Sequence, residues 1–563
     1  MSRVTLIVMG VLAGATVLAL VILGPYDERW ARAPDQERVT PPLAEPHRVS
    51  AEPMPGAPPE VAAAAREWPL PHHDYANTRA TSDARVTAAN VAQLRPVWDM
   101  QLSAHSHWGA ASSAPLIAEG VVYFQDLQSD VTALEMRSGR VRWKYRLKQE
   151  AFGPNGPAIG YGKVFLQDGI NGVRAADLRT GRPLWSKELA GPTGAQQPVA
   201  YGGFLYTGLV AGRIRRASRG NLRMDLIDGG SSGFAYGLRP HDGEMVWSFR
   251  TVERGFWGDP RVNSGGGIWF PPAIDTTTGR TFWSTGNPAP GPGTSEHPNA
   301  SSRPGPNLYT NTVLALDGED GHLDWHYQAK PHDMFHHDLQ NPPILASAGG
   351  RDLVVASGKG GYVFAIDRDS GELVWKTPVG IHRNDLLREL PADDRPVEVY
   401  PGFWGGIETP GAYADGTLYF VTENLPTSYT ATAWRSRTAA ENVQNLEGRT
   451  ALDEGRSELV AIDAATGRIR WRHPFAMVDF AGATVVNDLV FTATYDGTIY
   501  ALARADGHVV WRYRLPAGVI AWPAVAGDTM IWPAGLGRRP AVVALRLSGT
   551  PETEPPPQTE VGG

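Results

Sequence analysis

The chain of 563 residues contains no cysteine. This absence excludes disulfide bonds, cysteine-ligated zinc, iron–sulfur clusters, thiol catalysis and a lipid anchor on an N-terminal cysteine. An excess of positive charge is also missing, because 52 Lys and Arg stand against 59 Asp and Glu and give a net charge of −7. Non-specific nucleic-acid binding needs clustered positive charge, so we expect no nucleic-acid partner.

Turn-forming residues, in contrast, are abundant. The chain has 63 Gly and 46 Pro, with 42% hydrophobic and 20% charged residues. The hydrophobic and charged fractions are those of a globular protein rather than a disordered one. The surplus of Gly and Pro predicts many short strands separated by many turns.

The N-terminus carries one long apolar run, Val4 to Leu23, which has no polar face. Its length matches the ~20 residues that cross a bilayer as a helix, whereas a secretory signal core is usually shorter. We therefore expect a single-pass signal anchor in the cell membrane, with the rest of the chain outside the cytoplasm. Ala31-Arg32-Ala33 resembles a cleavage site. A removed signal peptide and a secreted protein therefore remain open, as does a buried soluble helix.

Proline density divides the remainder of the chain. Prolines crowd residues 34–60 and block both helix and strand pairing, which is typical of a semi-rigid tether. We predict an anchor over residues 1–24, a Pro-rich linker over 25–65, a folded domain over 66–547 and a disordered tail over 548–563.

An internal repeat is the strongest pattern in the folded part. Seven times a Gly is followed four residues later by a Trp, after a short strand-like segment. The pairs are Gly139/Trp143, Gly181/Trp185, Gly243/Trp247, Gly321/Trp325, Gly371/Trp375, Gly467/Trp471 and Gly507/Trp511. A strand, a turn at Gly and a strand with Trp form a hairpin. The shorter Trp-to-Trp intervals match the ~40–50 residues of one four-stranded propeller blade.

An eighth strand, Leu94 to Trp98, has the Trp without the Gly, and the stretch Val519 to Leu547 has strands without a final Trp. Each therefore forms part of one blade. We predict an all-β, eight-bladed β-propeller of four-stranded blades, preceded by an N-terminal transmembrane helix. Pairing the start of the chain with its end would remove the exposed sheet edges. We interpret the eight repeat tryptophans as packing between blades.

Ordered motifs across several blades resemble the pyrroloquinoline quinone (PQQ) dehydrogenases, eight-bladed propellers that include methanol and alcohol dehydrogenases. They are WPLPHHDYANTR (68–79), GGGIWFPPAID (265–275), TGNPAPGPG (285–293), NLYTNTVLALD (307–317), HYQAKPHD (326–333) and GKGGYVFAIDR (358–368). In that family PQQ lies flat near the propeller axis, stacked on a Trp, with a calcium or lanthanide ion beside its quinone oxygens.

The resemblance implies a cofactor position for Trp269, since a flat indole suits a planar aromatic cofactor. It places Lys359 near the quinone, and it places Asn424 and Asn155 at further PQQ contacts. For Trp269 the alternative is one more packing Trp. At Asn155 the family has an Arg that pairs with a PQQ carboxylate, so this charge pairing is lost.

The resemblance also implies metal ligands. A hard cation needs several oxygen ligands, which in the family come from a Glu, an Asn and an Asp. Asn287 matches the Asn, and Asp228 falls on the Glu position with a shorter carboxylate. For Asp228 the alternative is a turn residue, because it stands before Gly-Gly.

The catalytic segment departs most from the family, whose pattern is Pro-His-Asp-x-Trp-Asp with the last Asp as base. His336 occupies that position, and Asp338 stands where lanthanide-dependent members carry an extra metal-binding Asp. One interpretation makes His336 the base, since its ordinary pKa of ~6.5 suits proton abstraction. In another, Asp338 reaches the metal and the substrate. A vestigial site and a transition-metal pair of His332 with His336 are the remaining interpretations.

Other features of the family are also missing: the adjacent Cys pair over PQQ, a late Trp near residues 480–482, and a haem site. Without haem, the electron acceptor would be another protein or a membrane quinone. The function implied is that of an extracytoplasmic quinoprotein oxidoreductase acting on an alcohol or a related compound. The alternative is a non-catalytic propeller scaffold that binds other proteins, since a fold alone does not decide function.

Overall fold

The computed structural model describes residues 56–548, except residues 105, 107, 152, 170–171, 190–195, 212, 217–221, 226–228, 433 and 436–454. The apolar run at residues 4–23, most of the Pro-rich linker and residues 549–563 lie outside this part. Within the described residues, no helix combines the length and the apolar character needed to cross a membrane.

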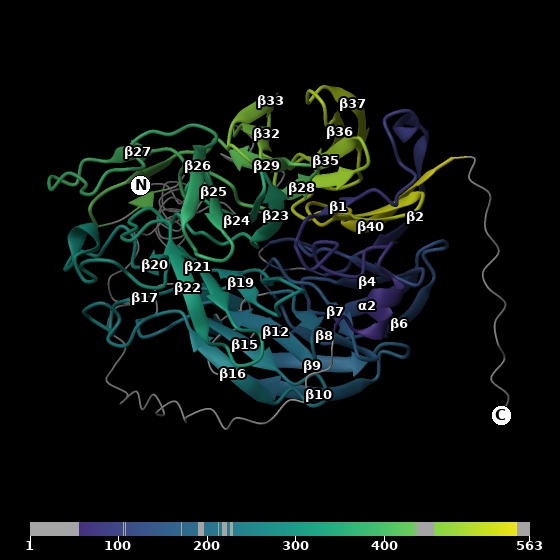
Figure 1. Ribbon diagram of the computed structural model, residues 1–563, viewed down its shortest axis with the longest axis horizontal. Helices are drawn as coiled ribbons and strands as arrows, with labels where there is room; N and C mark the ends of the chain where they lie inside the picture. Colours follow the sequence, from purple (N-terminus) through teal and green to yellow (C-terminus); the bar gives the residue numbers. More distant parts are fainter. Residues whose placement is uncertain are drawn as a thin grey trace, which may run out of the picture. The chain divides into compact units, whose positions relative to one another are not determined.

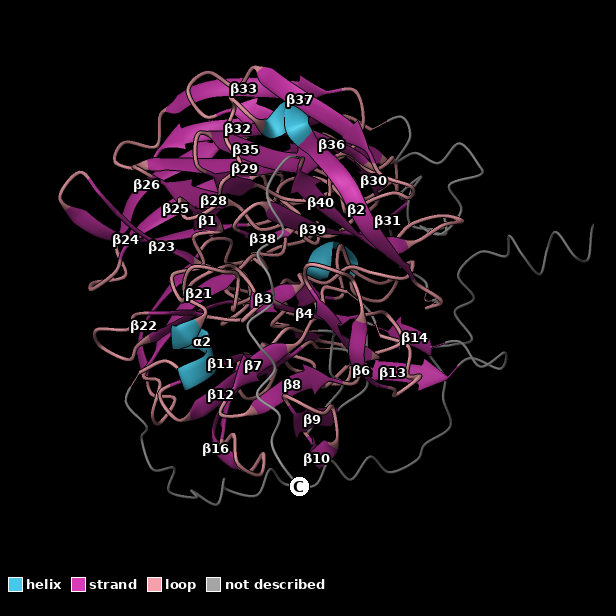
Figure 2. Ribbon diagram, turned by 90° about the vertical axis from the view of Figure 1, so that its right-hand side faces the viewer, coloured by secondary structure: helices cyan, strands magenta, loops and turns pink. Residues whose placement is uncertain are grey.

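Apart from three short helices, the regular secondary structure of the described part consists of strands joined by loops (Figures 1 and 2). Its core is a set of eight four-stranded antiparallel sheets, the blades, numbered here 1 to 8. Blade 1 consists of β3 (Leu116–Ala118), β4 (Val121–Gln125), β5 (Val131–Glu135) and β6 (Val141–Tyr145), and blade 2 of β7 (Ala158–Gly160), β8 (Lys163–Gln167), β9 (Gly172–Asp177) and β10 (Pro183–Glu188). Blade 3 consists of β11 (Val199–Tyr201), β12 (Phe204–Leu209), β15 (Phe234–Leu238) and β16 (Met245–Arg250), and blade 4 of β18 (Ala273–Ile274), β19 (Thr281–Ser284), β21 (Thr312–Leu316) and β22 (Leu323–Gln328).

Blade 5 consists of β23 (Ile344–Ala348), β24 (Arg351–Ser357), β25 (Tyr362–Asp367) and β26 (Leu373–Pro378), and blade 6 of β28 (Ala412–Ala414), β29 (Thr417–Glu423), β32 (Ser457–Asp463) and β33 (Ile469–Phe475). Blade 7 consists of β34 (Thr484–Val486), β35 (Leu489–Ala493), β36 (Thr498–Ala503) and β37 (Val509–Arg514), and blade 8 of β38 (Ala524–Ala526), β39 (Thr529–Ala534), β40 (Ala541–Leu547) and β2 (Leu94–Gln101). The predicted eight-bladed propeller is confirmed.

The elements outside the blades are short. They are β1 (Ala80–Thr81), which pairs with β34; the hairpin β13 (Arg213–Arg216) and β14 (Leu222–Asp225); the pair β17 (Ser264–Gly265) and β20 (Pro288–Ala289); the sheet of β27 (Val397–Val399), β30 (Thr427–Tyr429) and β31 (Trp434–Arg435); and the helices α2 (Pro59–Ala63), η2 (Val91–Gln93) and η3 (Pro298–Ala300). Most of them fall in the long Trp-to-Trp intervals, which exceed the length of one blade.

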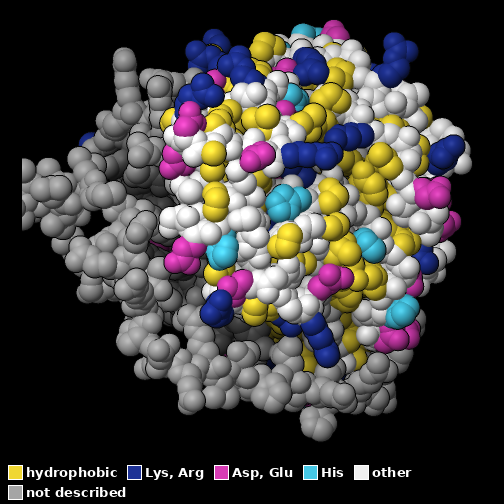
Figure 3. Space-filling view, turned by 90° about the vertical axis from the view of Figure 1, so that its left-hand side faces the viewer, with side chains coloured by type: hydrophobic (Ala, Val, Ile, Leu, Met, Phe, Trp, Pro, Cys, Tyr) yellow, Lys and Arg dark blue, Asp and Glu magenta, His cyan; other side chains and the backbone are white. Residues whose placement is uncertain are grey.

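Burial follows the position of a strand in its blade. The second strand β4 is buried at every residue, whereas the fourth strand β6 alternates between exposed and half-buried residues. Inner strands are covered on both faces by neighbouring blades, and outer strands keep solvent contact. On the face shown in Figure 3, Lys and Arg side chains are interspersed with Asp and Glu side chains.

The ring is closed by the two ends of the folded chain. The strand β2, which precedes blade 1 in the sequence, pairs antiparallel with β40, with Leu94 opposite Leu547 and Gln101 opposite Ala541 (Figure 1). Leu94 is fully buried and belongs to the hydrophobic cluster that also contains Leu547. The pairing predicted between the strand of Trp98 and the last strands is therefore confirmed, and β2 covers the open edge of β40.

The repeat tryptophans join each blade to the next. In seven of the eight cases, the indole Nε1 donates a hydrogen bond of 2.9–3.2 Å to a backbone carbonyl in the last hairpin turn of the following blade. The pairs are Trp98 with Met136, Trp143 with Leu178, Trp185 with Pro240, Trp247 with Gly318, Trp325 with Arg368, Trp375 with Ala464 and Trp471 with Arg504. The spacing of the repeat thus encodes the interface between blades.

The repeat glycines complete this interface. Gly321 has a φ of +72°, and a Cβ added to it would lie 2.5 Å from the ring of Trp247 in the preceding blade. Glycine is needed here both for the left-handed backbone and for the close approach of the indole. The other repeat glycines show the same pair of features, for example Gly371 against Trp325.

This interface can be tested by a pair of substitutions. Gly279 has a φ of +77°, but a Cβ there would meet nothing within 4 Å. We expect Gly279→Ala to cost about 1–2 kcal/mol of unfolding free energy, through the left-handed backbone alone. Gly321→Ala should cost an additional ~1–3 kcal/mol, because the new methyl group overpacks against Trp247. Chemical denaturation measures both, and equal losses would contradict the proposed packing role.

Candidate active site

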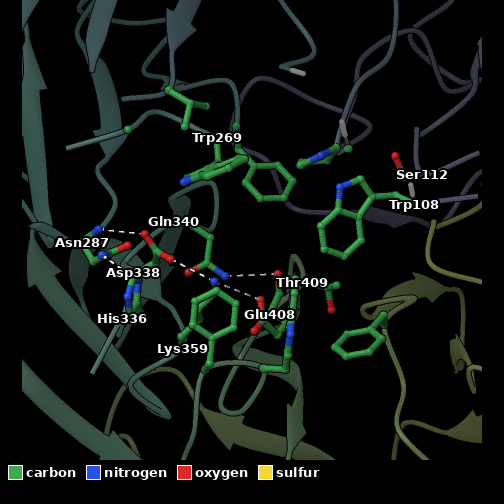
Figure 4. Close-up of a pocket in the computed structure, with 18 of the residues that line it drawn as sticks. Trp108, Ser112, Trp269, Asn287, His336, Asp338, Gln340, Lys359, Glu408 and Thr409 are labelled. Carbon is green, nitrogen blue, oxygen red and sulfur yellow. Dashed lines mark hydrogen bonds and ion pairs between the residues drawn. The ribbon is translucent and has the colours of Figure 1, made fainter. Parts of the chain in front are cut away.

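An aromatic-walled cavity of about 300 Å³ lies where loops from the different blades meet (Figure 4). In an up-and-down four-stranded blade, the loop before the first strand and the loop between the second and third strands lie at the same end of the sheet. The cavity is lined by these two kinds of loop. Trp269, Asp338 and Glu408 precede the first strands of blades 4, 5 and 6, and Asn287 and Lys359 follow the second strands of blades 4 and 5.

Asp338 is the centre of the polar wall. Its Oδ1 accepts a hydrogen bond of 2.7 Å from the backbone N–H of Asn287, and its Oδ2 lies 3.0 Å from Lys359 Nζ. Asp338 is 5% exposed, so its charge is neutralised by a lysine and a backbone donor and not by solvent. Such a carboxylate is fixed in position and faces the cavity.

Gly286 allows this arrangement. A Cβ at Gly286 would lie 2.5 Å from Asp338 Oδ1 and 3.2 Å from Trp269 Nε1. Any larger residue would therefore push the carboxylate and the indole apart. The Thr-Gly-Asn motif thus brings a backbone donor to Asp338 and keeps Trp269 close to it.

His336 is buried with both ring nitrogens engaged. Its Nε2 is 3.1 Å from the carbonyl of Gly291, and its Nδ1 is 3.1 Å from Asn287 Nδ2. A carbonyl only accepts, so Nε2 carries the hydrogen and Nδ1 accepts from the Asn287 amide. Burial lowers the pKa of His336, and the ring is neutral. Since Nδ1 is occupied, the geometry favours Asp338 over His336 as the proton acceptor.

Lys359 is buried between two carboxyl groups. Its Nζ is 3.0 Å from Asp338 and 4.0 Å from Glu408 Oε2. Burial alone would lower the pKa of Lys359, but the attraction of Glu408 and Asp338 outweighs burial and raises it. Burial raises the pKa of Glu408 to about 8, against the opposing attraction of Lys359. The nearer Asp338 therefore pairs with the ammonium.

Several polar atoms on the cavity wall have no hydrogen-bond partner although they are buried. They are Ser112 Oγ, Gln340 Oε1, Glu408 Oε1, Thr409 Oγ1 and Trp522 Nε1. Burying a polar group without a partner costs free energy, and native proteins rarely do so. A wall of aromatic rings with unpartnered donors and acceptors is suited to a flat ligand with polar groups on its rim.

Two family profiles and several curated proteins match the chain. The profile described as "Glucose/ethanol/alcohol dehydrogenase, beta-propeller domain" matches residues 220–379. The profile described as "Outer membrane protein assembly factor BamB" matches residues 82–255 and 411–547. Quinoprotein alcohol dehydrogenase PedH of Pseudomonas putida is 27% identical over 502 residues, which are 77% of this chain and 79% of PedH. A quinoprotein ethanol dehydrogenase of Pseudomonas aeruginosa is 25% identical over 520 residues, with 78% and 80% covered.

Solved structures show the same fold. A europium-containing methanol dehydrogenase superposes with a TM-score of 0.70 at 18% identity, over 86% of this chain and 98% of the other. The quinohemoprotein alcohol dehydrogenase of Comamonas testosteroni gives 0.70 at 21% identity, over 88% and 82%. The chain is thus similar in sequence to quinoprotein alcohol dehydrogenases over more than three quarters of its length, and it shares the eight-bladed fold of the solved alcohol and methanol dehydrogenases. The resemblance stated from the motifs is confirmed.

Five of the residues singled out by comparison with this quinoprotein family meet at the cavity: Trp269, Asn287, His336, Asp338 and Lys359. Two others do not line it. Asn424 Oδ1 accepts a hydrogen bond of 2.8 Å from the N–H of Ile381, and so supports the turn after β26. Asn155 is buried and donates to the carbonyl of Asp126 at 3.0 Å. Asp228 lies outside the described residues.

The pair of His332 and His336 is not found. Residues 331–340 form a loop, and His332 contacts the carbonyl of Gly305 at 3.2 Å, whereas His336 contacts Gly291. Among the described residues, no three His, Asp or Glu side chains are grouped as ligands of a metal ion.

Trp108, Trp404, Glu408 and Trp522 are among the lining residues that sequence reasoning missed. Trp108 and Trp404 do carry a signal, because neither follows a Gly by four residues and neither ends a strand of the repeat. The packing between blades that explains the repeat tryptophans does not explain a Trp outside the repeat, so such a Trp is a candidate for another role. Glu408 carries no signal of this kind, since only the fold reveals its burial.

Proposed function

We propose that this protein is a PQQ-dependent dehydrogenase that oxidises an alcohol, with calcium or a lanthanide ion beside the cofactor. The observation that carries the proposal is the fixed carboxylate of Asp338, held by Lys359 and by the Asn287 N–H, on the wall of an aromatic cavity. The alcohol dehydrogenases named among its relatives support the same chemistry.

The residues present fit PQQ. The cofactor is planar and carries carbonyl and carboxylate oxygens on its rim, and the cavity offers aromatic faces together with unpartnered polar atoms. Trp269 would hold the ring plane, and Lys359 would supply a positive charge to an oxygen on the rim. PQQ, when bound, supplies a quinone that accepts the hydride of the alcohol carbon.

Side chains of the protein would accept the substrate proton and exclude water from the site. Asp338 would accept the hydroxyl proton of the substrate at Oδ1 or Oδ2, as a general base. Phe403 and Trp404 border the cavity beside Lys359, whose Nζ lies 4.9 and 5.4 Å from their ring centres. These rings would exclude water, which strengthens the charge interactions inside.

A cation would bind beside Asp338. Both hydrogens of Asn287 Nδ2 are engaged, with the Pro288 carbonyl at 2.8 Å and with His336. The amide is therefore oriented so that Oδ1 is the atom left for a cation. Asp338 and Asn287 supply oxygen ligands of the kind that hard cations require. Asp228, outside the described residues, is proposed as the third ligand from the family match alone.

The location and the electron acceptor are further parts of the proposal. The apolar run Val4–Leu23 supports a single-pass anchor with the propeller outside the cytoplasm. Because the chain has no haem attachment motif, electrons would leave to a separate protein or a membrane quinone. The net charge of −7 supports the expectation that nucleic acid is not a partner.

Reconstitution tests the proposal. We expect the purified protein to retain PQQ absorbance through gel filtration when loaded with PQQ and Ca²⁺ or La³⁺, and to reduce a dye with an alcohol as donor. Removal of the cation by a chelator should abolish the activity, because Asp338 and Asn287 then hold no cation beside the cofactor. A protein that retains no PQQ with either cation would instead be a propeller scaffold. Retention and full turnover without any cation would contradict the cation site.

A further inference from the structure

Three buried carboxyl groups lie at and behind one wall of the cavity. The Glu408 side chain is 8% exposed and lines the cavity, whereas Glu423 is 2% and Asp479 0% exposed. The proton chemistry described above uses none of them. Isolated ionised carboxylates are costly to bury, so each group needs a partner or a proton.

Glu408 has little compensation for a negative charge. Its Oε2 is 4.0 Å from Lys359 Nζ, which is already paired with Asp338 at 3.0 Å. Its Oε1 is buried on the cavity wall and has no hydrogen-bond partner (Figure 4). The group therefore presents an unsatisfied polar atom to whatever fills the cavity.

The ionisable side chains behind Glu408 are two further carboxyl groups, Glu423 and Asp479, and neither can neutralise a negative charge on Glu408. Glu423 ends β29 and exchanges backbone hydrogen bonds with Gly406, two residues before Glu408. Its Oε2 accepts a hydrogen bond of 3.1 Å from the N–H of Asp479, whose Oδ2 accepts one of 2.5 Å from Thr492. Of the charged groups in the described part of the chain, those that face Glu408 are thus Lys359, Asp338, Glu423 and, behind it, Asp479.

The balance of charges favours the protonated form of the carboxyl groups of this cluster, Glu408, Glu423 and Asp479. One ammonium faces four carboxyl groups, and the nearest of them, Asp338, neutralises it. Burial raises the pKa of Glu408 to about 8 and that of Asp479 to about 7, and it raises that of Glu423 far above the ordinary value. Near neutral pH, Glu408 and Glu423 are therefore neutral acids.

We propose that Glu408 is held protonated and donates a hydrogen bond from its carboxyl group to an acceptor oxygen of PQQ, so that the cofactor binds together with a proton on Glu408. This inference rests on the proposed function, because PQQ is the ligand. PQQ is itself a polycarboxylate. A second ionised carboxylate on the wall would repel it, whereas a neutral acid can donate a hydrogen bond to it.

The direction of the pH dependence follows from this linkage. PQQ binds the protonated form, so bound cofactor raises the pKa of Glu408 further. Affinity should be constant below pH 8 and should fall by about tenfold per pH unit above it, as the free protein loses the proton. The carboxyls of PQQ, with ordinary values of ~4, stay ionised throughout this range.

The test uses the full-length protein and PQQ with Ca²⁺. We expect the Kd of the wild type to rise between pH 8 and 9.5, and calorimetry at pH 9 in two buffers of different ionisation enthalpy to show uptake of about one proton. Glu408→Gln keeps a neutral donor and should give a Kd that is flat over this range, without proton uptake. Asp479→Asn is the matched control, since it removes a buried carboxyl outside the cavity and should keep the wild-type slope.

The outcomes separate this inference from the function on which it rests. PQQ binding by the wild type without pH dependence or proton uptake overturns the role of Glu408 and leaves the dehydrogenase proposal intact. A slope that survives in Glu408→Gln also overturns it. If the wild type and both variants bind no PQQ at any pH, the proposed function fails and this inference fails with it. The wild-type measurement decides even where a variant does not fold.

Discussion

Replacing Asp338 by Asn is expected to lower the kcat of the PQQ-loaded protein by about 10²–10⁴-fold, the usual contribution of a general base. The substitution keeps the shape of the side chain and removes its charge. An amide oxygen can still accept from the Asn287 N–H, but an amide cannot take the hydroxyl proton. A dye-linked assay with saturating alcohol and PQQ measures the loss.

His336→Gln distinguishes the two interpretations of the catalytic segment. His336 contacts the Gly291 carbonyl and the Asn287 amide, so we assign it the positioning of Asn287. Its replacement should lower kcat much less than Asp338→Asn does. A glutamine can donate to a carbonyl and accept from an amide, and a mild loss therefore supports positioning. If His336→Gln costs more than Asp338→Asn, His336 is the base and the assignment to Asp338 is wrong.

Thermal unfolding controls for damage to the fold. In Asp338→Asn the buried Lys359 loses its nearest partner, so we expect some loss of stability together with the loss of turnover. The result expected is a variant that still unfolds cooperatively, at a temperature below that of the wild type but above the assay temperature, and that does not turn over. Retained turnover in a folded Asp338→Asn protein would show that the Asp338 carboxylate is not the general base.

The repeat made the blades predictable because each repeat residue has a local physical task. Gly321 supplies a left-handed turn, and the tryptophan four residues later docks on the next blade, so their spacing is fixed by the hairpin itself. The closing pair of β2 and β40 followed from the same pattern, since one hairpin was divided between the two ends of the chain.

The site was less predictable because it lies in loops whose lengths differ between blades. Asn287 and Lys359 stand directly after the second strands of blades 4 and 5, where the strand patterns are strong, and both reach the cavity. Asn424 and Asn155 were placed by the family resemblance alone, and neither lines the cavity. Glu408 differs in kind, because its importance arises from burial beside Lys359, which only the closed ring creates.

The contribution of ring closure to the free energy of unfolding can be measured at Leu94. This residue of β2 is 0% exposed and packs in the cluster that joins blade 8 to its neighbours, whereas Val97 in the same strand is 45% exposed. An Asp at position 94 would lose the apolar burial of Leu, worth about 1.5–3 kcal/mol, and would bury a carboxyl group without a partner. An Asp at position 97 would stay in water.

We therefore expect Leu94→Asp to lower the free energy of unfolding by about 4 kcal/mol or more, and Val97→Asp to change it by less than about 0.5 kcal/mol. The two variants carry the same new charge in the same strand, so net charge and strand propensity do not explain a difference. Urea denaturation followed by tryptophan fluorescence measures both. Because β2 covers the edge of β40, Leu94→Asp should also expose that edge, and size-exclusion chromatography should show association that Val97→Asp lacks. Equal stability of the two variants would mean that β2 does not hold the ring closed.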